Sequence, residues 1–472
     1  MNTIHTKLWI ILSVLFGLCL FLSVFFSILK PPIRGIADQG DFERMMTWIG
    51  VEYQSTEYNS KYFHWVNRLY TLGPAKRGEV ISSEVILLHG ARFIHTVLHK
   101  TIFDMQILGI LQTAVFCLAL SLTSLYVFSL YGTFGFLFIP FALCIFSDIG
   151  YTAYFNSFYQ ESSGIIFLFF VLVVILKTLH DGKTKNSVLN LILFTLASIL
   201  LISAKAQYFI LFLPILCTQF ILFSSKHTKK MLVSIGILIT AFSITFYSWG
   251  TPTIIKEWNV YNSVFPQILG NTNNKERAMH ILNIDPQFLN YAGIYASENN
   301  SGIDDPTLKP LLTVNVFPRV LLYYMRTPLE FISLSKEIEK KSFEPLIRYL
   351  GYYENSNGYI PTEQPKSSIH WYNLKRSIIS RYYLFVLPFI FCMCLVSLYQ
   401  CTYKKNMRYV PVLFIASLAI SQFFVIAFSE GVSGSIEKML FLFNVCFDLL
   451  LFIFLCILIK QTVYFLKRKK HK

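Results

Sequence analysis

The sequence predicts an all-α polytopic membrane protein with about ten transmembrane helices and two large polar loops on the outer face. Hydrophobic residues make up 54% of the 472 and charged residues only 14%, whereas soluble domains carry about 25% charged residues. Several apolar runs are long enough to cross a hydrocarbon core of about 30 Å. The net charge is +15, but Lys and Arg gather at the ends of these runs, which reports membrane orientation. We therefore expect a lipid bilayer, and no nucleic acid, as the partner.

The first apolar run covers residues 8–29 and follows His5 and Lys7. It is too long for the apolar part of a signal peptide and no small-residue cleavage site follows, so we interpret it as a retained first span. Nine further spans are predicted at 104–130, 133–148, 161–178, 187–204, 207–224, 230–249, 383–402, 410–429 and 439–460.

Basic residues predict the orientation of these spans. Short connections near residues 180, 227 and 405 are rich in Lys and Arg, and they alternate with connections nearly free of positive charge. Basic connections stay on the cytoplasmic side, and the basic tail 467–470 agrees. Both termini are therefore predicted to be cytoplasmic, which requires an even number of spans. The stretch 187–224 is basic at both ends and fits a helical hairpin with Lys205 at its outer tip.

The spans divide the chain into three predicted parts. Both outer loops are too polar and too long to be simple connectors. An amphipathic stretch near 85–97 in the first loop is typical of a helix on the membrane surface, and the second loop has a helical pattern around 316–338. The first part is an N-terminal transmembrane module, 1–249, and its first outer loop, 30–103, carries the catalytic region. The second is a large extracellular loop, 250–382, and the third comprises C-terminal hairpins with a basic tail, 383–472.

Acidic residues are concentrated directly after the first span. Asp38, Asp41 and Glu43 lie there together with Arg44, and Gly40 allows the backbone to turn. Asp41 is a candidate N-cap of a short helix, with Arg44 three residues on and therefore near it. The alternative to a catalytic carboxylate is a capped and solvated surface helix.

A second polar stretch, 148–161, lies between the third and fourth spans. Aromatic rings stack on sugar faces while neighbouring polar groups bind hydroxyls, so this composition favours a sugar-binding surface. An interfacial aromatic belt is the alternative, but polar groups at the bilayer edge are costly unless they are used. The candidate substrate contacts are Asp148, Tyr154, Asn156, Ser157 and Glu161.

Two further charged residues lie near or within spans. Lys205, close to Gln207 at the predicted hairpin tip, could bind a lipid-linked phosphate or pair with Asp148 or Glu161, although snorkelling alone would also explain it. Asp448 lies near the middle of the last span, where we predict a structural role facing the bundle.

This arrangement resembles the GT-C class of membrane glycosyltransferases, and more closely the bacterial glycan-biosynthesis hexose transferases. The resemblance covers residues 38 to about 293 and predicts a GT-C-like bundle. It rests on Asp38-Gln-Gly-Asp41-Phe-Glu-Arg44, Tyr151-Thr-Ala-Tyr-Phe-Asn156-Ser-Phe-Tyr-Gln-Glu161, Lys205-Ala-Gln207, Val260-Tyr261-Asn262-Ser-Val-Phe265, Asn283-Ile-Asp285-Pro286 and Tyr291-Ala-Gly293.

The sequence thus predicts a hexosyltransferase of the bacterial plasma membrane. Its donor would be a polyprenyl-phosphate sugar and its acceptor a glycan or glycolipid outside, with Asp41 or Asp38 as base and Arg44 or Lys205 as the phosphate-binding cation. Gln207, Tyr261 and Asn262 are further candidate substrate contacts. The class includes metal-dependent and metal-independent members, so a divalent metal is left open. The alternatives are an O-antigen-type polymerase or ligase, and a lipid-linked sugar transporter. No repeat of broken spans, the usual sequence trace of a secondary transporter, is present.

Overall fold

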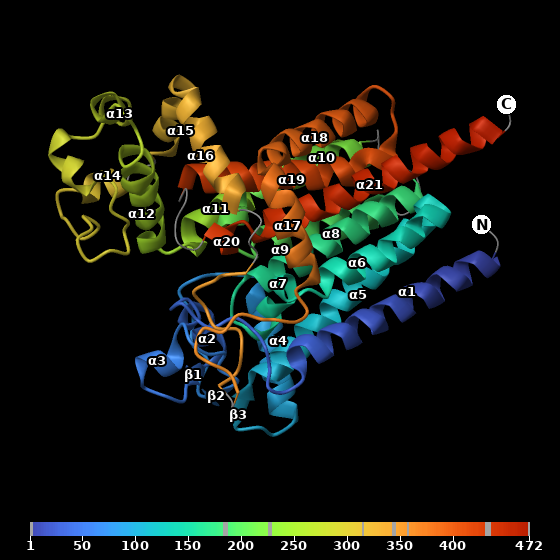
Figure 1. Ribbon diagram of the computed structural model, residues 1–472, viewed down its shortest axis with the longest axis horizontal. Helices are drawn as coiled ribbons and strands as arrows, with labels where there is room; N and C mark the ends of the chain where they lie inside the picture. Colours follow the sequence, from blue (N-terminus) through green and yellow to red (C-terminus); the bar gives the residue numbers. More distant parts are fainter. Residues whose placement is uncertain are drawn as a thin grey trace.

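The chain forms a bundle of long helices with loops gathered at one end (Figure 1). The computed structural model describes residues 3–182, 187–224, 229–313, 316–341, 346–355, 358–429 and 436–470. The two ends of the chain lie at the same end of the bundle, opposite the large loops (Figure 1). This is a polytopic, predominantly α-helical membrane fold, so the predicted fold class is confirmed.

Within the described ranges, eight helices are long and apolar enough to cross a membrane. Each coincides with a predicted span. They are α1 (Thr3–Val24) with η1 (Phe25–Leu29), α5 (Met105–Tyr131), α8 (Glu161–Asp181), η5 (Ala206–Leu211) with α10 (Phe212–Phe223), α11 (Lys229–Gly250), η8 (Ile379–Phe385) with α18 (Val386–Thr402), η9 (Met407–Tyr409) with α19 (Val410–Ser429), and α21 (Phe441–Lys470).

The two remaining predicted spans differ from simple crossings. The span predicted at 133–148 is η3 (Gly132–Leu137) with α6 (Phe138–Phe146), and a bend of 70° separates it from α7 (Ile149–Thr152) and η4 (Ala153–Asn156). Asp148 stands at the corner, where its carboxylate accepts the N–H of Gly150 and starts a new helix. The predicted span therefore coincides with the first arm of a bent helix pair. The other, α9 (Ser187–Ile202), has 16 residues and spans only about 24 Å.

The first outer loop is more ordered than a surface linker. Its helices are α2 (Glu43–Met46), η2 (Thr47–Ile49), α3 (Tyr58–Lys61) and α4 (Glu84–Val97). The predicted amphipathic helix is thus confirmed as α4, whose Ile86 and Phe93 are exposed. A small antiparallel sheet, which was not predicted, joins β1 (Val51–Tyr53), β2 (Leu69–Leu72) and β3 (Ile102–Asp104) in that order. Strands of three or four residues are too short to show an alternating pattern.

The second outer loop divides into two bodies. Its first part forms an outer lobe with its own apolar core, and the predicted helix near 316–338 is confirmed there as two helices broken at Thr327. The later part returns to the first loop, where the N–H of Gly351 donates to the carbonyl of Phe63 at 2.8 Å. The lobe consists of α12 (Thr253–Asn262), η6 (Ser263–Leu269), α13 (Lys275–Leu282), η7 (Pro286–Tyr291), α14 (Lys309–Thr313), α15 (Phe317–Arg326) and α16 (Pro328–Lys341).

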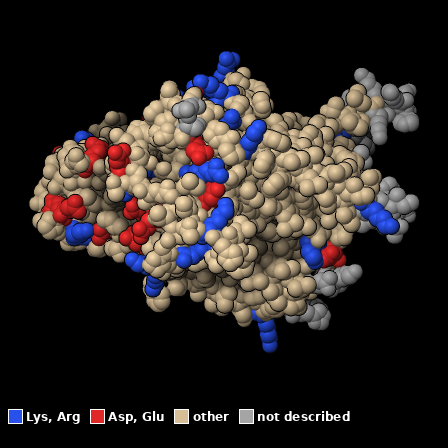
Figure 2. Space-filling model, turned by 90° about the horizontal axis from the view of Figure 1, so that it is seen from below, with Lys and Arg blue, Asp and Glu red and all other residues tan. Residues whose placement is uncertain are grey.

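On the face of the molecule that Figure 2 shows, charged side chains are unevenly distributed. In Figure 2 acidic residues gather at the end where Figure 1 places the outer lobe, and the face beside the spans is largely uncharged. Such a band suits contact with lipid tails, because a charge in hydrocarbon is costly.

A buried ion pair fastens the second loop to the last span. Lys375 of α17 (His370–Ile378) lies 2.9 Å from the carboxylate of Asp448, and both side chains are 0% exposed. Asp448 also accepts hydrogen bonds from Trp371 Nε1, at 2.7 Å, and from the hydroxyl of Tyr151. Asp448 therefore faces the interior of the bundle and has a structural role, because it holds α17 against the last span, as predicted.

We expect reporter fusions at residues 60 and 300 to read outside and a fusion near 405 to read inside, because basic connections oppose translocation. Activity of paired phosphatase and fluorescent reporters at each position measures this. An inside signal at residue 300 would contradict the orientation. The same prediction also rests on residues that lie outside the described ranges, namely Lys183, Lys185, Lys226 and residue 434.

Candidate functional site

A large cavity opens at the loop-bearing end of the bundle. Its volume is about 1520 Å³, which exceeds the roughly 300–1,000 Å³ of common ligand pockets. The first outer loop, the start of α8, the α9–η5 turn, α11, the outer lobe, α19 and α20 (Ile436–Met439) all contribute walls. One wall is apolar and includes Leu213, Ile244 and Phe424, whereas the rim near the first loop is charged.

Asp41 is the centre of the charged rim. Its Oδ1 lies 2.7 Å from Arg44 Nη1, and its Oδ2 lies 2.5 Å from Lys438 Nζ and accepts a hydrogen bond from Gln39 at 2.7 Å. The predicted neighbourhood of Asp41 and Arg44 is thus confirmed. Lys438 also lies over the ring of Tyr159, with Nζ 4.6 Å from the ring centre.

The two cations determine the charge state of Asp41. Burial by itself raises the pKa of Asp41, but attraction to Lys438 and Arg44 outweighs this, and the pKa lies well below its ordinary value. Burial lowers the pKa of Lys438, yet Asp41 and then Glu161 raise it, and the net pKa is above the usual value. Both groups are therefore charged at neutral pH.

A second ion pair lies on the same rim. Lys205 Nζ is 2.6 Å from Glu161 Oε1, with Glu161 at the first residue of α8 and Lys205 at the turn between α9 and η5. Of the two predicted partners of Lys205, the structure thus selects Glu161. Gln207 also lines the cavity, and its amide donates to the carbonyl of Met439 at 2.9 Å. The charged rim, defined as Asp41, Arg44, Glu161, Lys205 and Lys438, holds three cations and two carboxylates.

Asp38 does not reach the cavity. Its Oδ1 accepts the N–H groups of Gly40, Asp41 and Phe42 at 2.8, 2.8 and 3.1 Å, and its Oδ2 accepts the hydroxyl of Tyr53. Burial raises the pKa of Asp38. Asp38 therefore shapes the turn that presents Asp41, and the prediction of Asp41 as the N-cap was wrong, because Phe42 occupies that position of α2.

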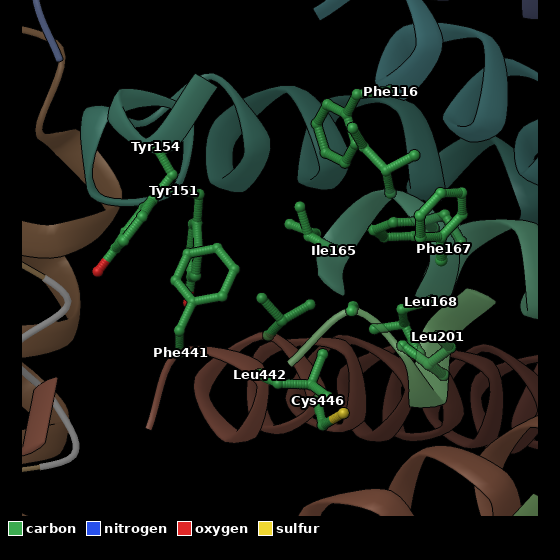
Figure 3. Packing of buried hydrophobic residues seen from close by; sticks show 14 of the residues in the cluster. Phe116, Tyr151, Tyr154, Ile165, Phe167, Leu168, Leu201, Phe441, Leu442 and Cys446 are labelled. Carbon is green, nitrogen blue, oxygen red and sulfur yellow. The ribbon is translucent and has the colours of Figure 1, made fainter. Parts of the chain in front are cut away.

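Four residues of the predicted sugar-binding surface are buried away from the cavity. The Tyr154 ring packs against Phe441 at 4.6 Å between centres, inside the core (Figure 3). Asn156 donates to the carbonyls of Ile28 and Arg34, and Ser157 donates to the carbonyl of Tyr154. Asp148 accepts the backbone N–H groups of Trp371 and Tyr372. In place of the predicted sugar contacts, these side chains pack in the core or bond to the backbone. This applies to Asp148, Tyr154, Asn156 and Ser157.

The two predicted contacts from α12 differ. Asn262 lines the cavity, and its side-chain oxygen accepts the N–H of Ala296 at 3.0 Å. Tyr261 lies in the core of the outer lobe, where its hydroxyl accepts the N–H of Gly302 at 3.1 Å. Only Asn262 is placed to touch a ligand.

Sequence reasoning missed Lys438 and Tyr349, both of which line the cavity. Gln39 and Tyr159 also line it, and each lies in a predicted polar stretch without having been assigned a role. Lys438 did carry a signal, because it is a cation directly before a span in a connection predicted to be outside, where positive charge is scarce. Among the residues that the structure describes, no group of three or more His, Cys, Asp and Glu could hold a metal ion.

The bundle defines an integral-membrane protein of the polytopic helical class, whose cavity joins an apolar wall to a charged rim. The family model described as the YfdI N-terminal transmembrane domain matches residues 2–472, so the chain belongs to this family. Comparison with curated proteins and with solved structures found no match.

Proposed function

We propose that the protein is a GT-C-class glycosyltransferase of the bacterial plasma membrane. It would move a hexose from a polyprenyl-phosphate donor to an acceptor glycan or glycolipid on the outer face. The observation that carries this proposal is one cavity that combines an apolar wall with the charged rim. A polyprenyl chain suits the apolar wall, and a phosphate with its attached sugar suits the charged rim.

The apolar wall offers the donor an entry from the bilayer. Leu213 and Ile244 line the cavity and are 51% and 56% exposed. They belong to α10 and α11, two candidate spans. Because these apolar side chains are exposed on candidate spans, we infer that a polyprenyl chain can lie against them without entering water.

The charged rim suits the donor phosphate. Three cations face two carboxylates, which leaves an excess of one positive charge. Arg44 can bind phosphate oxygens through two N–H groups, and Lys205 and Lys438 supply compact charges. Gln207 and Asn262 supply amides at the wall for sugar hydroxyls.

Asp41 is the proposed base. The acceptor hydroxyl would attack the anomeric carbon with its proton passing to Asp41, while the bond from that carbon to the phosphate oxygen breaks. The cations stabilise the polyprenyl phosphate that leaves. A bound phosphate would share Lys438 and Arg44 with Asp41, which raises the pKa of Asp41 and makes it a stronger base once the donor is present. Attack from the side opposite to the phosphate inverts the anomeric centre.

The transporter alternative would need free polar groups at mid-membrane depth. Asp448 lies within the last span, but it is paired with Lys375 and bonded to Trp371. The ion pairs of Asp41 and Glu161 instead line the cavity, which supports transfer chemistry.

Lys205→Ala should raise the KM for a lipid-linked hexose donor by about tenfold or more, because a charge-assisted phosphate contact is lost. Purified protein in detergent with a radiolabelled polyprenyl-phosphate hexose measures this. Lys177→Ala is a matched control, since Lys177 forms an equally short ion pair with Asp181 near the other end of α8. Efficient transfer from a nucleotide sugar without any lipid carrier would overturn the proposed donor.

A further inference from the structure

A small pocket lies where the second outer loop enters the span of α18. Its volume is about 380 Å³, and it is lined by Asn373, Arg376, Ser377 and Arg381. It is separate from the large cavity, with which it shares no lining residue. Two guanidinium groups and an amide are donors that suit a phosphate group, while the Ser377 hydroxyl donates to the carbonyl of Leu374 at 3.0 Å.

The buried face of α17 determines that its polar face is exposed. Trp371 and Lys375 are buried and hold α17 to the bundle through Asp448. Asn373, Arg376 and Ser377 are three and four residues apart and therefore share an exposed face. The ion pair thus fixes the helix and leaves the polar face towards the surroundings.

Exposed apolar residues border the pocket. Leu374 and Ile378 are 45% and 53% exposed, and Tyr382 and Phe385 are 61% and 69% exposed. Arg381 is itself the first residue of a candidate membrane span, Arg381–Thr402. Arginines beside exposed apolar side chains at the start of a span are expected at the level of lipid headgroups, whose phosphates their guanidinium groups can bind.

We propose that this pocket binds the phosphate of an anionic phospholipid in the outer leaflet. The apolar residues Leu374, Ile378 and Phe385 would contact the acyl chains, and Arg376 and Arg381 would hold the headgroup. This lipid is not the donor, and the proposal does not depend on the transfer activity.

Binding of phosphatidylglycerol to the full-length protein in detergent tests the proposal, with native mass spectrometry as the readout. Arg376→Gln with Arg381→Gln should weaken binding by about 25-fold, because each interfacial cation contributes roughly fivefold. Lys76→Gln with Arg77→Gln removes the same charge from the first outer loop and should bind as the wild type does. Arg376→Lys with Arg381→Lys should retain part of the affinity.

Two outcomes would overturn the lipid site. The first is equal binding of phosphatidylglycerol by the wild type and the double glutamine variant. The second is protection against thermal unfolding by inorganic phosphate at millimolar concentration without any effect of phosphatidylglycerol, since that would assign the pocket to a free anion. Phosphatidylcholine should bind weakly, because its headgroup carries no net charge. A melting temperature of the double variant near that of the wild type establishes that it is folded.

Discussion

Asp41→Asn should lower the rate of hexose transfer by about 10²- to 10⁴-fold, the usual contribution of a general base. The amide can still accept hydrogen bonds from Gln39 and Lys438, but it cannot take the proton of the acceptor hydroxyl. Transfer by purified protein, together with the amount of protein in the membrane, measures the effect.

Two neighbouring carboxylates serve as controls. Glu43→Gln alters an exposed side chain that bonds to Tyr62 outside the cavity, and it should transfer normally. Asp38→Ala should destabilise the loop by roughly 1–3 kcal/mol or more, because three backbone N–H groups lose their acceptor. Normal transfer by Asp41→Asn would exclude Asp41 as the base.

Lys375→Met should lower the free energy of unfolding by about 3–5 kcal/mol, because it leaves the buried charge of Asp448 without its partner. Thermal unfolding in detergent measures this loss. Adding Asp448→Asn should recover much of it, since Asn still accepts from Trp371 and Tyr151 but carries no charge.

Lys177→Met is the matched control for this experiment. It breaks an ion pair whose side chains are partly exposed, where water screens the charges, and such pairs contribute about 0–1 kcal/mol. If Lys375→Met unfolded at the wild-type temperature, the pair would not hold α17 to the last span.

Spans are predictable because lipid requires a long apolar run, and α5, α18 and α19 each coincide with one. The bend at Asp148 was missed for a physical reason. Hydropathy reports that residues are apolar, but not that a carboxylate caps a new helix within the same run. The sheet of the first loop was missed because its strands are held by pairing with distant partners rather than by their own pattern.

The candidate site was predictable where its contacts are local. Asp41 and Arg44 are three residues apart, and this short separation along the chain brings them together at the start of α2. Lys438 meets Asp41 across 397 positions of the chain, and no local pattern carries that contact. Tyr154 and Asn156 illustrate the opposite error, because aromatic and polar residues in one stretch suit a sugar surface and a packed helix junction equally well.

The contact between Asp41 and Lys438 also bears on biosynthesis. The first outer loop leaves the ribosome long before α20 does, so a nascent chain has Asp41 and Arg44 without Lys438, the second cation that contacts Asp41. The charged rim is therefore completed only when the last hairpin has inserted, and a chain arrested earlier would carry the carboxylate but not its full setting. The protein would then become able to carry out the proposed transfer only late in its synthesis, after nearly all of its spans have been inserted.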